Sequence, residues 1–313
     1  MKTNNPLQKT ILITAGSTYL DIDAYACCVA MQELLSLQGK RAIAYSTAPC
    51  NYSVCASLTA EGQMTDTLPQ DVCPSCCDYI IVDVSDPAFL SDSVPLERVS
   101  AVYDHHTGFE DYWHARIGDN AKIEFVGAAA TLVYREWQKS KMQDSMSRQT
   151  ALLLIAAILD NTLNLTSSNT TEEDLDVFRT LCRKENIGED WCASYFAEVQ
   201  KSVEADLKTA LLKDTKTVQS EILPPRVAQL AVWDAQSLLN RLPDIRKWFG
   251  ESERYLINII DIRKHCSYFV CDDVPSQEKI APIFGIVFEN GVAETPVSYL
   301  RKEIIKKTQH IPS

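Results

Sequence analysis

The chain has 313 residues, of which 46% are hydrophobic, 23% charged and 8% aromatic, and this length and composition are typical of a globular protein with two domains. They exclude a disordered chain, a collagen-like fibre and a small disulfide scaffold, and no apolar run reaches the roughly 18 residues of a membrane span. The formal net charge of −12 disfavours generic nucleic-acid binding, because basic side chains supply most of that affinity.

The start of the chain contains no pattern typical of a signal peptide. Residues 1–8 are polar, and the apolar run at 10–15 is too short for a signal-peptide core. We therefore expect a cytoplasmic protein whose 11 cysteines are reduced thiols. Cys73-Pro-Ser-Cys76, together with Cys50 and Cys55, has a spacing that fits a zinc site, although a cysteine-tolerant surface insertion ahead of a strand is the simpler interpretation.

Strands and helices alternate in the first half of the chain. Apolar runs predict strands at 10–15, 41–45, 79–84, 98–103 and 122–126. Helical patterns follow at 24–37, 128–138 and 148–159, and a capping box at Thr170-Thr-Glu-Glu173 opens a further helix that extends to about residue 183. This order predicts an α/β domain with a mostly parallel sheet and helices on both faces.

A polar segment at 183–190 is the best candidate for a domain boundary. We place the first domain at residues 1–188 and the second at 189–313. The second domain is predicted to be a smaller α+β unit, with a helix at 191–212 and strands at 226–232, 255–260, 268–271 and 283–288. Its tail at 301–307 is locally basic.

Acidic residues and histidines collect where the predicted elements of the first domain end. They are Asp21, Asp23, Asp83, Asp104, His105, His106 and Asp160. The carboxyl ends of parallel strands lie along one edge of a sheet, so these side chains should converge there. Converging carboxylates repel one another unless cations neutralise them. A pair of divalent metal ions that share one Asp would do so, and carboxylate-rich ligands favour Mn²⁺ or Mg²⁺ over zinc.

Each of these motifs has a simpler interpretation when it is taken alone. Asp-x-Asp after a strand is often a helix N-cap with a solvated neighbour. Adjacent histidines are often surface residues, and Asp160 could be a turn residue at a helix end. Their order along the chain makes the combination specific.

Taken together, Asp21-Ile-Asp-Ala24, Val82-Asp83, Asp104-His-His106 and Ile158-Leu-Asp-Asn-Thr-Leu-Asn164 resemble the four signatures of the DHH phosphoesterase superfamily. In the second half, Leu211-Leu-Lys-Asp-Thr-Lys216 and Leu300-Arg-Lys-Glu-Ile304 resemble elements of one branch. That branch contains the DHH-type exopolyphosphatases and the family II (manganese-dependent) inorganic pyrophosphatases. The resemblance implies a DHH domain followed by a DHHA2-like domain.

The resemblance also implies a role for each residue. Asp83 would bridge two metal ions, Asp21 would bind one of them, and the other would be bound by Asp23, His105 and Asp160. His106 would lie beside the substrate phosphate and help to protonate the leaving group, and Asp104 would orient a histidine. The substrate's outer phosphates would be bound from the second domain by Lys216, Arg301 and Lys302, which without the resemblance would be interpreted as solvated basic residues.

Three positions differ from the branch pattern. Ser17 replaces a metal-binding His of the pyrophosphatases, where the exopolyphosphatases have Asn, and this favours the exopolyphosphatase side. Val84 replaces the His after the bridging Asp, and Leu300 replaces the Ser of Ser-Arg-Lys. These changes leave room for altered substrate choice or reduced turnover.

The resemblance implies a hydrolase of acid anhydrides in which a metal-bridged hydroxide releases phosphate from polyphosphate or pyrophosphate. Such a protein would have a small phosphorylated substrate, no generic nucleic-acid or membrane partner, and would be a monomer or homodimer. Two alternatives stay open. One is a phosphodiesterase or nuclease acting on short oligonucleotides or cyclic nucleotides, and the other is a non-catalytic polyphosphate-binding relative.

Overall fold

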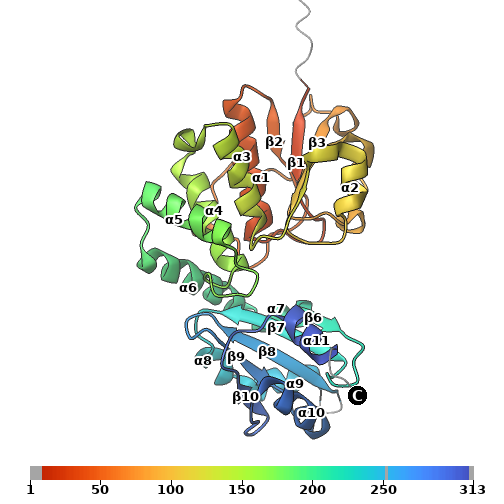
Figure 1. Cartoon of the computed structure of the whole chain (residues 1–313), viewed down its shortest axis with the longest axis vertical. Coiled ribbons are helices and arrows are strands. Elements are labelled where there is room, and N and C mark those ends of the chain that lie inside the picture. Colours follow the sequence, from red (N-terminus) through yellow and green to blue (C-terminus); the bar gives the residue numbers. More distant parts are fainter. Residues whose placement is uncertain (1–8, 251–252, 310–313) are drawn as a thin grey trace, which may run out of the picture. The chain divides into compact units, whose positions relative to one another are not determined.

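The computed structural model describes residues 9–250 and 253–309. The chain forms two compact units, Met1–Cys192 and Ala193–Ser313 (Figure 1). Helix α6 (Glu189–Ala205) crosses the division between them.

The first unit is built on a five-stranded sheet in which every pairing is parallel, with the strand order β2-β1-β3-β4-β5. The strands are β1 (Ile11–Thr14), β2 (Ala42–Ala44), β3 (Asp78–Val82), β4 (Val99–Asp104) and β5 (Ala121–Ile123). Four residues of β3 and five of β4 are buried, as expected of strands that helices cover on both faces. The predicted fold class is confirmed.

Three helices contact the strands of this sheet, α1 (Ile22–Leu37), α2 (Glu110–Ile117) and α3 (Ala129–Lys139). Two more, α4 (Arg148–Asn161) and α5 (Glu172–Glu185), pack against other helices (Figure 1). Trp113 of α2 is fully buried in a cluster with Ile81 and Val102. Helix α1 contacts β1 and β3, and it also packs against α3 and α4. It is therefore apolar around most of its circumference rather than along one stripe.

The second unit contains a mixed sheet with the order β10-β9-β8-β7-β6. Its strands are β6 (Thr215–Thr217), β7 (Arg226–Val232), β8 (Tyr255–Asp261), β9 (Cys266–Val270) and β10 (Val292–Glu294). Only the β7–β8 pair is parallel among these strands. The helices are α7 (Leu207–Lys213), α8 (Gln236–Leu239), α9 (Leu242–Phe249), α10 (Val274–Phe284) and α11 (Arg301–Gln309).

The structure corrects several predicted elements. The strand predicted at 283–288 is wrong, because helix α10 continues to Phe284 and ends at Gly285 in the left-handed region. The single helix predicted at 191–212 is two helices, since Asp206 caps α7 by accepting a hydrogen bond from the Thr209 amide. The capping box is formed one residue later than predicted, by Thr171 and Asp174, because Asp174 also binds a distant loop.

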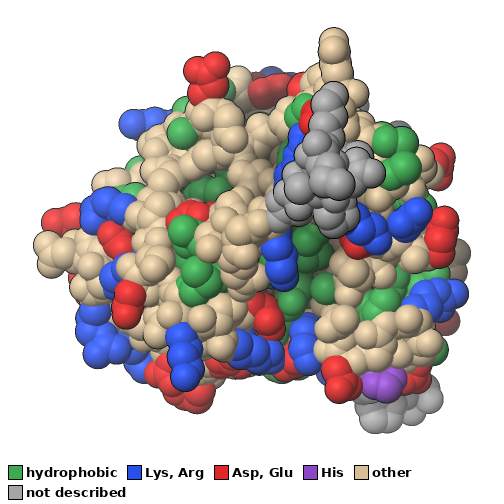
Figure 2. Space-filling view, turned by 90° about the horizontal axis from the view of Figure 1, so that it is seen from above, with side chains coloured by type: hydrophobic (Ala, Val, Ile, Leu, Met, Phe, Trp, Pro, Cys, Tyr) green, Lys and Arg blue, Asp and Glu red, His purple; other side chains and the backbone are tan. Residues whose placement is uncertain are grey.

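No described helix combines the length and the hydropathy that a transmembrane segment requires. Figure 2 shows Lys and Arg side chains interspersed with Asp and Glu on the face that it presents. On that face the cations therefore do not form a continuous basic surface of the kind that binds nucleic acid.

Candidate metal centre

The predicted ligands of the first three motifs lie where the strands of the parallel sheet end. Asp21 is the N-cap of α1, in the loop after β1, and its Oδ1 accepts a hydrogen bond from the Ala24 amide at 2.9 Å. Asp83 follows β3 directly, and His105 and His106 follow β4. Asp83 has a φ of 56°, a backbone strain that proteins retain mostly at functional sites.

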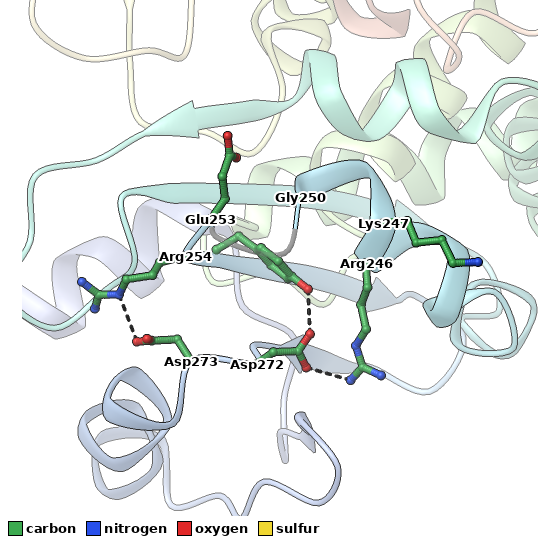
Figure 3. Close-up of a pocket in the computed structure, with 8 residues that line it drawn as sticks. Arg246, Lys247, Gly250, Glu253, Arg254, Asp272 and Asp273 are labelled. Atoms are coloured by element: carbon green, nitrogen blue, oxygen red, sulfur yellow. Dashed lines mark hydrogen bonds and ion pairs between the residues drawn. The ribbon is translucent and has the colours of Figure 1, made fainter.

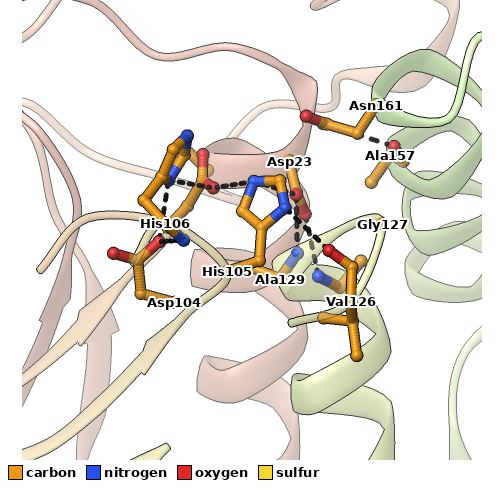
Figure 4. A network of polar contacts seen from close by, with 12 residues as sticks. Asp23, Asp104, His105, His106, Val126, Gly127, Ala129, Ala157 and Asn161 are labelled. Atoms are coloured by element: carbon orange, nitrogen blue, oxygen red, sulfur yellow. Dashed lines mark hydrogen bonds and ion pairs between the residues drawn. The ribbon is translucent and has the colours of Figure 1, made fainter. Parts of the chain in front are cut away.

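Asp83, His105 and His106 offer ligand atoms that all lie within 4.8 Å of one another. Figure 4 shows His105 and His106 side by side. The Nε2 atom of His105 is 3.4 Å from Oδ1 of Asp83. Both atoms are buried, and neither has a hydrogen-bond partner within the described residues. Buried polar atoms without partners are rare in folded proteins, so this pair points to a missing ligand.

His105 is oriented through its other ring nitrogen. Nδ1 lies 3.2 Å from the carbonyl oxygen of Val126, which can only accept a hydrogen bond, so Nδ1 carries the proton. The lone pair of Nε2 then faces Asp83 and Asp23, whose Oδ2 is 4.0 Å away. A backbone carbonyl that fixes the tautomer in this way is the usual support of a metal-binding histidine.

Asp23 lies in the first turn of α1 and is fully buried, and its carboxylate meets the N-terminus of α3. Its two carboxylate oxygens accept hydrogen bonds of 2.8 Å from the amides of Ala129 and Ala130, which the helix itself cannot pair. Burial, and then the charge of Asp83, raise the pKa of Asp23 despite these bonds. A carboxylate has about four lone-pair sites, so Asp23 can cap the helix and still bind a cation.

The charge of the site favours a divalent metal ion. Burial raises the pKa of Asp83 well above its usual value, and the negative charge of Asp21 raises it further. A cation would stabilise the charged form of the same carboxylates, because it offsets both the cost of their burial and the repulsion between their charges. The donors are carboxylate oxygens and imidazole nitrogens, a set that suits Mn²⁺. The residues present therefore fit the metal that the sequence motifs imply.

Asp104 and His106 form a second pair beside the first. Nδ1 of His106 is 2.9 Å from Oδ1 of Asp104, and this bond raises the pKa of His106. Burial acts to raise the pKa of Asp104, but the hydrogen bond to His106 contributes to a net lowering. Asp104 is fully buried, whereas the His106 side chain is 65% exposed. Nε2 of His106 is therefore the nitrogen available to a substrate.

The loop that carries the histidines is held by α2, a helix that the sequence pattern did not reveal. The hydroxyl of Ser85 donates to the carbonyl of His106 at 3.2 Å, and the indole of Trp113 donates to the carbonyl of Ser85 at 2.6 Å. The buried Trp113 thereby connects the segment after β3 to the segment after β4.

Asp160 is the last residue but one of α4 and is half-buried. It thus lies at the end of a helix, as predicted. It is not among the three residues whose ligand atoms lie together. Leu163, Asn164 and Leu165 follow with φ values of 48°, 59° and 66°. Consecutive left-handed residues other than glycine are costly, so the turn after Asp160 stores backbone strain close to a predicted ligand.

The segment 127–130, which donates two amides to Asp23, is itself held in place by Asp174. The sequence analysis did not identify it. The Gly127 amide donates to Asp174 at 2.7 Å, and the Thr131 hydroxyl donates to the same carboxylate at 2.5 Å. A Cβ atom on Gly127 would lie 2.6 Å from Thr162 and 2.7 Å from Asp174. The glycine and three alanines at 127–130, between a strand and a helix, are the signal that could have identified this close approach.

Ser17, in the position where pyrophosphatases have a histidine, is bound to the backbone. Its hydroxyl donates to the carbonyl of Phe89 at 3.0 Å, and its amide donates to the same oxygen at 2.8 Å. Val84 is buried in the core and offers no ligand atom. Neither position supplies an imidazole to the site.

The predicted phosphate-binding residues lie in the second unit. Lys216 is exposed on β6 and Lys302 is exposed in the first turn of α11. The Arg301 side chain is only 11% exposed, and its guanidinium donates to Oδ1 of Asp214 at 2.8 Å and to the Asp214 carbonyl. Asp214 thus orients Arg301, while the two lysines project from the surface.

The second unit also contains a cavity of about 520 Å³ beside Arg246, Arg254 and Tyr255 (Figure 3). Arg246 is paired with Asp272 at 3.0 Å, and Arg254 is paired with Asp273 at 3.1 Å. Because the acids of the lining offset its cations, this cavity is a poor site for phosphate.

Comparisons with known proteins agree with the motifs. No family model matches the chain. It is 24% identical over 251 residues to a protein of Staphylococcus epidermidis named as a manganese-dependent inorganic pyrophosphatase, covering 75% of each chain. A protein of the same name from Deinococcus radiodurans is 25% identical, over 97% of each chain.

Two solved structures share the fold. One, from Methanococcus jannaschii and assigned to the family II inorganic pyrophosphatases, has a TM-score of 0.62 at 18% identity, covering 96% of this chain and 99% of that one. The other is an exopolyphosphatase-related protein of Bacteroides fragilis, with a TM-score of 0.53 at 12% identity, covering 96% and 91%. The two structures show that the fold is shared, and the relatives carry the name of the branch that the sequence motifs resemble.

Proposed function

We propose that this chain, a relative of the manganese-dependent inorganic pyrophosphatases, is a metal-dependent hydrolase of phosphoanhydride bonds whose substrate is pyrophosphate or polyphosphate. The observation that carries the proposal is the buried, unpartnered pair formed by Oδ1 of Asp83 and Nε2 of His105. Such a pair within a cluster of carboxylates is costly to bury without a cation.

Two divalent ions, Mn²⁺ or Mg²⁺, would be held by Asp21, Asp23, Asp83, His105 and Asp160, with Asp83 between them. When bound, the ions would lower the pKa of a water molecule and polarise a phosphoryl oxygen, the chemistry that phosphoanhydride hydrolysis requires.

The remaining residues position the substrate and move a proton. Asp104 keeps a proton on Nδ1 of His106, so Nε2 can hold a second proton for the leaving phosphate. Lys216 and Lys302 would neutralise phosphate oxygens as point charges, and Arg301 would do so through a guanidinium that Asp214 already orients.

A second candidate is hydrolysis of short oligonucleotides or cyclic nucleotides. Tyr19, Phe89 and Phe125 are 54%, 57% and 66% exposed, and they lie in the segments after β1, β3 and β5, at the same edge of the sheet as the ligands. Exposed aromatic side chains can stack on bases, so this rim favours a substrate that contains a nucleobase.

The test is phosphate release from pyrophosphate and from long-chain polyphosphate, in Mn²⁺ and then in Mg²⁺, with a chelator control. Short oligonucleotides and cyclic nucleotides are assayed in parallel. We expect chelator-sensitive release from at least one phosphoanhydride, and loss of release in Asp83→Asn. The matched control is Asp86→Asn, whose carboxylate caps a short turn by accepting from Ala88. Cleavage of the nucleotides alone would favour the second candidate. Phosphate release by Asp83→Asn at the wild-type rate would contradict the assignment of Asp83 to the active metal site.

A further inference from the structure

The Cys73-Pro-Ser-Cys76 motif has no part in the proposed metal chemistry. Cys50 and Cys55 do not complete a zinc site with it, because the only group of three or more potential ligands within the described residues is the one at Asp83. The segment instead forms a short 3₁₀ turn, Pro74–Cys76, immediately before β3. All four residues of the motif are exposed.

The turn brings the two thiols together. The Cys76 amide donates to the Cys73 carbonyl at 2.9 Å, and this hydrogen bond closes a turn that begins at one cysteine and ends at the other. The ends of such a turn are less than about 7 Å apart between Cα atoms, close to the range of about 4.4–6.8 Å that a disulfide needs.

The turn is also anchored, so the thiols do not have to be brought together by a flexible loop. Val72 and Cys77, on either side of it, belong to the hydrophobic core. The Cys77 thiol donates to the Cys73 carbonyl at 3.2 Å, and the Tyr79 hydroxyl donates to the Pro74 carbonyl at 3.3 Å. A disulfide across this turn would therefore form on a preorganised backbone.

The pKa of the Cys73 thiol is shifted in the opposite direction from that of the neighbouring Cys77 thiol. Hydrogen bonds from Ser75, whose hydroxyl is 3.2 Å away, and from Cys76 lower the pKa of Cys73. Burial raises the pKa of Cys77. The thiolate is the nucleophile in disulfide exchange, so Cys73 is suited to attack and Cys76 to resolve the product.

We propose that Cys73 and Cys76 form a thiol–disulfide exchange site that is oxidised by low-molecular-weight disulfides. The Cys73 thiolate attacks one sulfur of the small disulfide, a protein–small-molecule disulfide forms, and one small thiolate leaves. The Cys76 thiolate then attacks the Cys73 sulfur and displaces the second small thiolate. The two protons of the protein thiols pass to the two released thiolates. The protein loses two electrons and the small disulfide gains them.

The experiment equilibrates the full chain with mixtures of reduced and oxidised glutathione, alkylates the remaining thiols under denaturing conditions, and measures intact mass and the linked peptide. We expect the number of alkylated cysteines to fall by two, with a Cys73–Cys76 bond in the peptide map. In Cys76→Ser the mixed disulfide should accumulate on Cys73, whereas Cys73→Ser should form an adduct at least about tenfold more slowly, since it lacks the thiolate that the Ser75 hydroxyl stabilises.

Cys50→Ser, at another exposed cysteine, is the matched control and should behave like the wild type. A bond that involves Cys50, glutathione adducts without an internal disulfide in the wild type, or equal rates in the two motif variants would overturn the proposal. The readout is mass rather than hydrolysis, so the result is independent of the proposed function.

Discussion

The buried Oδ1 of Asp83 lies 3.4 Å from the buried Nε2 of His105, and neither atom has a hydrogen-bond partner within the described residues. Val126 fixes the imidazole through Nδ1, so the unpartnered nitrogen is the one with the lone pair. A divalent cation would satisfy both atoms together with the carboxylate of Asp23, whose Oδ2 lies 4.0 Å from the same nitrogen of His105 (Figure 4).

Metal binding should therefore stabilise the fold. At a concentration of Mn²⁺ about 100 times its dissociation constant, a ligand that binds only the folded state adds about 2.7 kcal/mol, which raises the Tm of a domain of this size by several degrees. Thermal unfolding with and without chelator measures the shift. Asp83→Asn should lose most of it and Asp86→Asn should keep it; an equal shift in both variants would contradict the assignment of Asp83.

Asp104→Asn should separate the positioning of His106 from metal binding. Because the amide cannot hold the charge of a protonated His106, we expect kcat to fall by about 10–100-fold, the usual loss when a supporting partner is changed. KM and the stabilisation by Mn²⁺ should change little. Steady-state kinetics and thermal shifts on the same preparations check both, and an unchanged kcat would mean that Asp104 has only a structural role.

Asp214→Asn should weaken substrate binding through Arg301. The guanidinium would lose a charge-assisted bond worth about 1.5–3 kcal/mol, so we expect KM for the phosphate substrate to rise by about tenfold or more. Arg301→Lys should have a similar effect, since an ammonium cannot reproduce the fork. Lys247→Met, which changes a cation paired with Asp244, is the control. Equal KM values in all three variants would show that Arg301 does not bind the substrate.

Gly127→Ala should destabilise the protein, because the new methyl group would lie 2.6 Å from Thr162 and 2.7 Å from Asp174, and overpacking a core costs about 1–3 kcal/mol. Gly188→Ala is the matched control, since nothing lies within 4 Å of a Cβ there and the cost should stay within about 0.5 kcal/mol. Urea unfolding measures both. Equal free energies of unfolding for the two variants would show that the contacts of Asp174 adjust to the added methyl group without loss of stability.

The apolar strands and the acidic residues that follow them could be predicted from the sequence. Short β-branched runs alternating with helical patterns leave few alternatives to a parallel sheet, and the carboxyl ends of its strands share an edge. Asp21, Asp23, Asp83, His105 and His106 could therefore be placed together. Helix α2 was missed because its single core residue, Trp113, leaves a polar segment without periodicity, and the run at 283–288 was misread because a short apolar run fits a strand or a helix end equally well.

The supports of the site were decided only by the tertiary structure. Asp23 binds the N-terminus of α3 across 106 residues of sequence, and Asp214 holds Arg301 across 87. Local periodicity reports which face of an element is buried, but it does not report which distant backbone amide or side chain will meet a given carboxylate. Those pairings depend on how the packed elements approach one another, and it is this packing that leaves Asp83 and His105 buried and without partners.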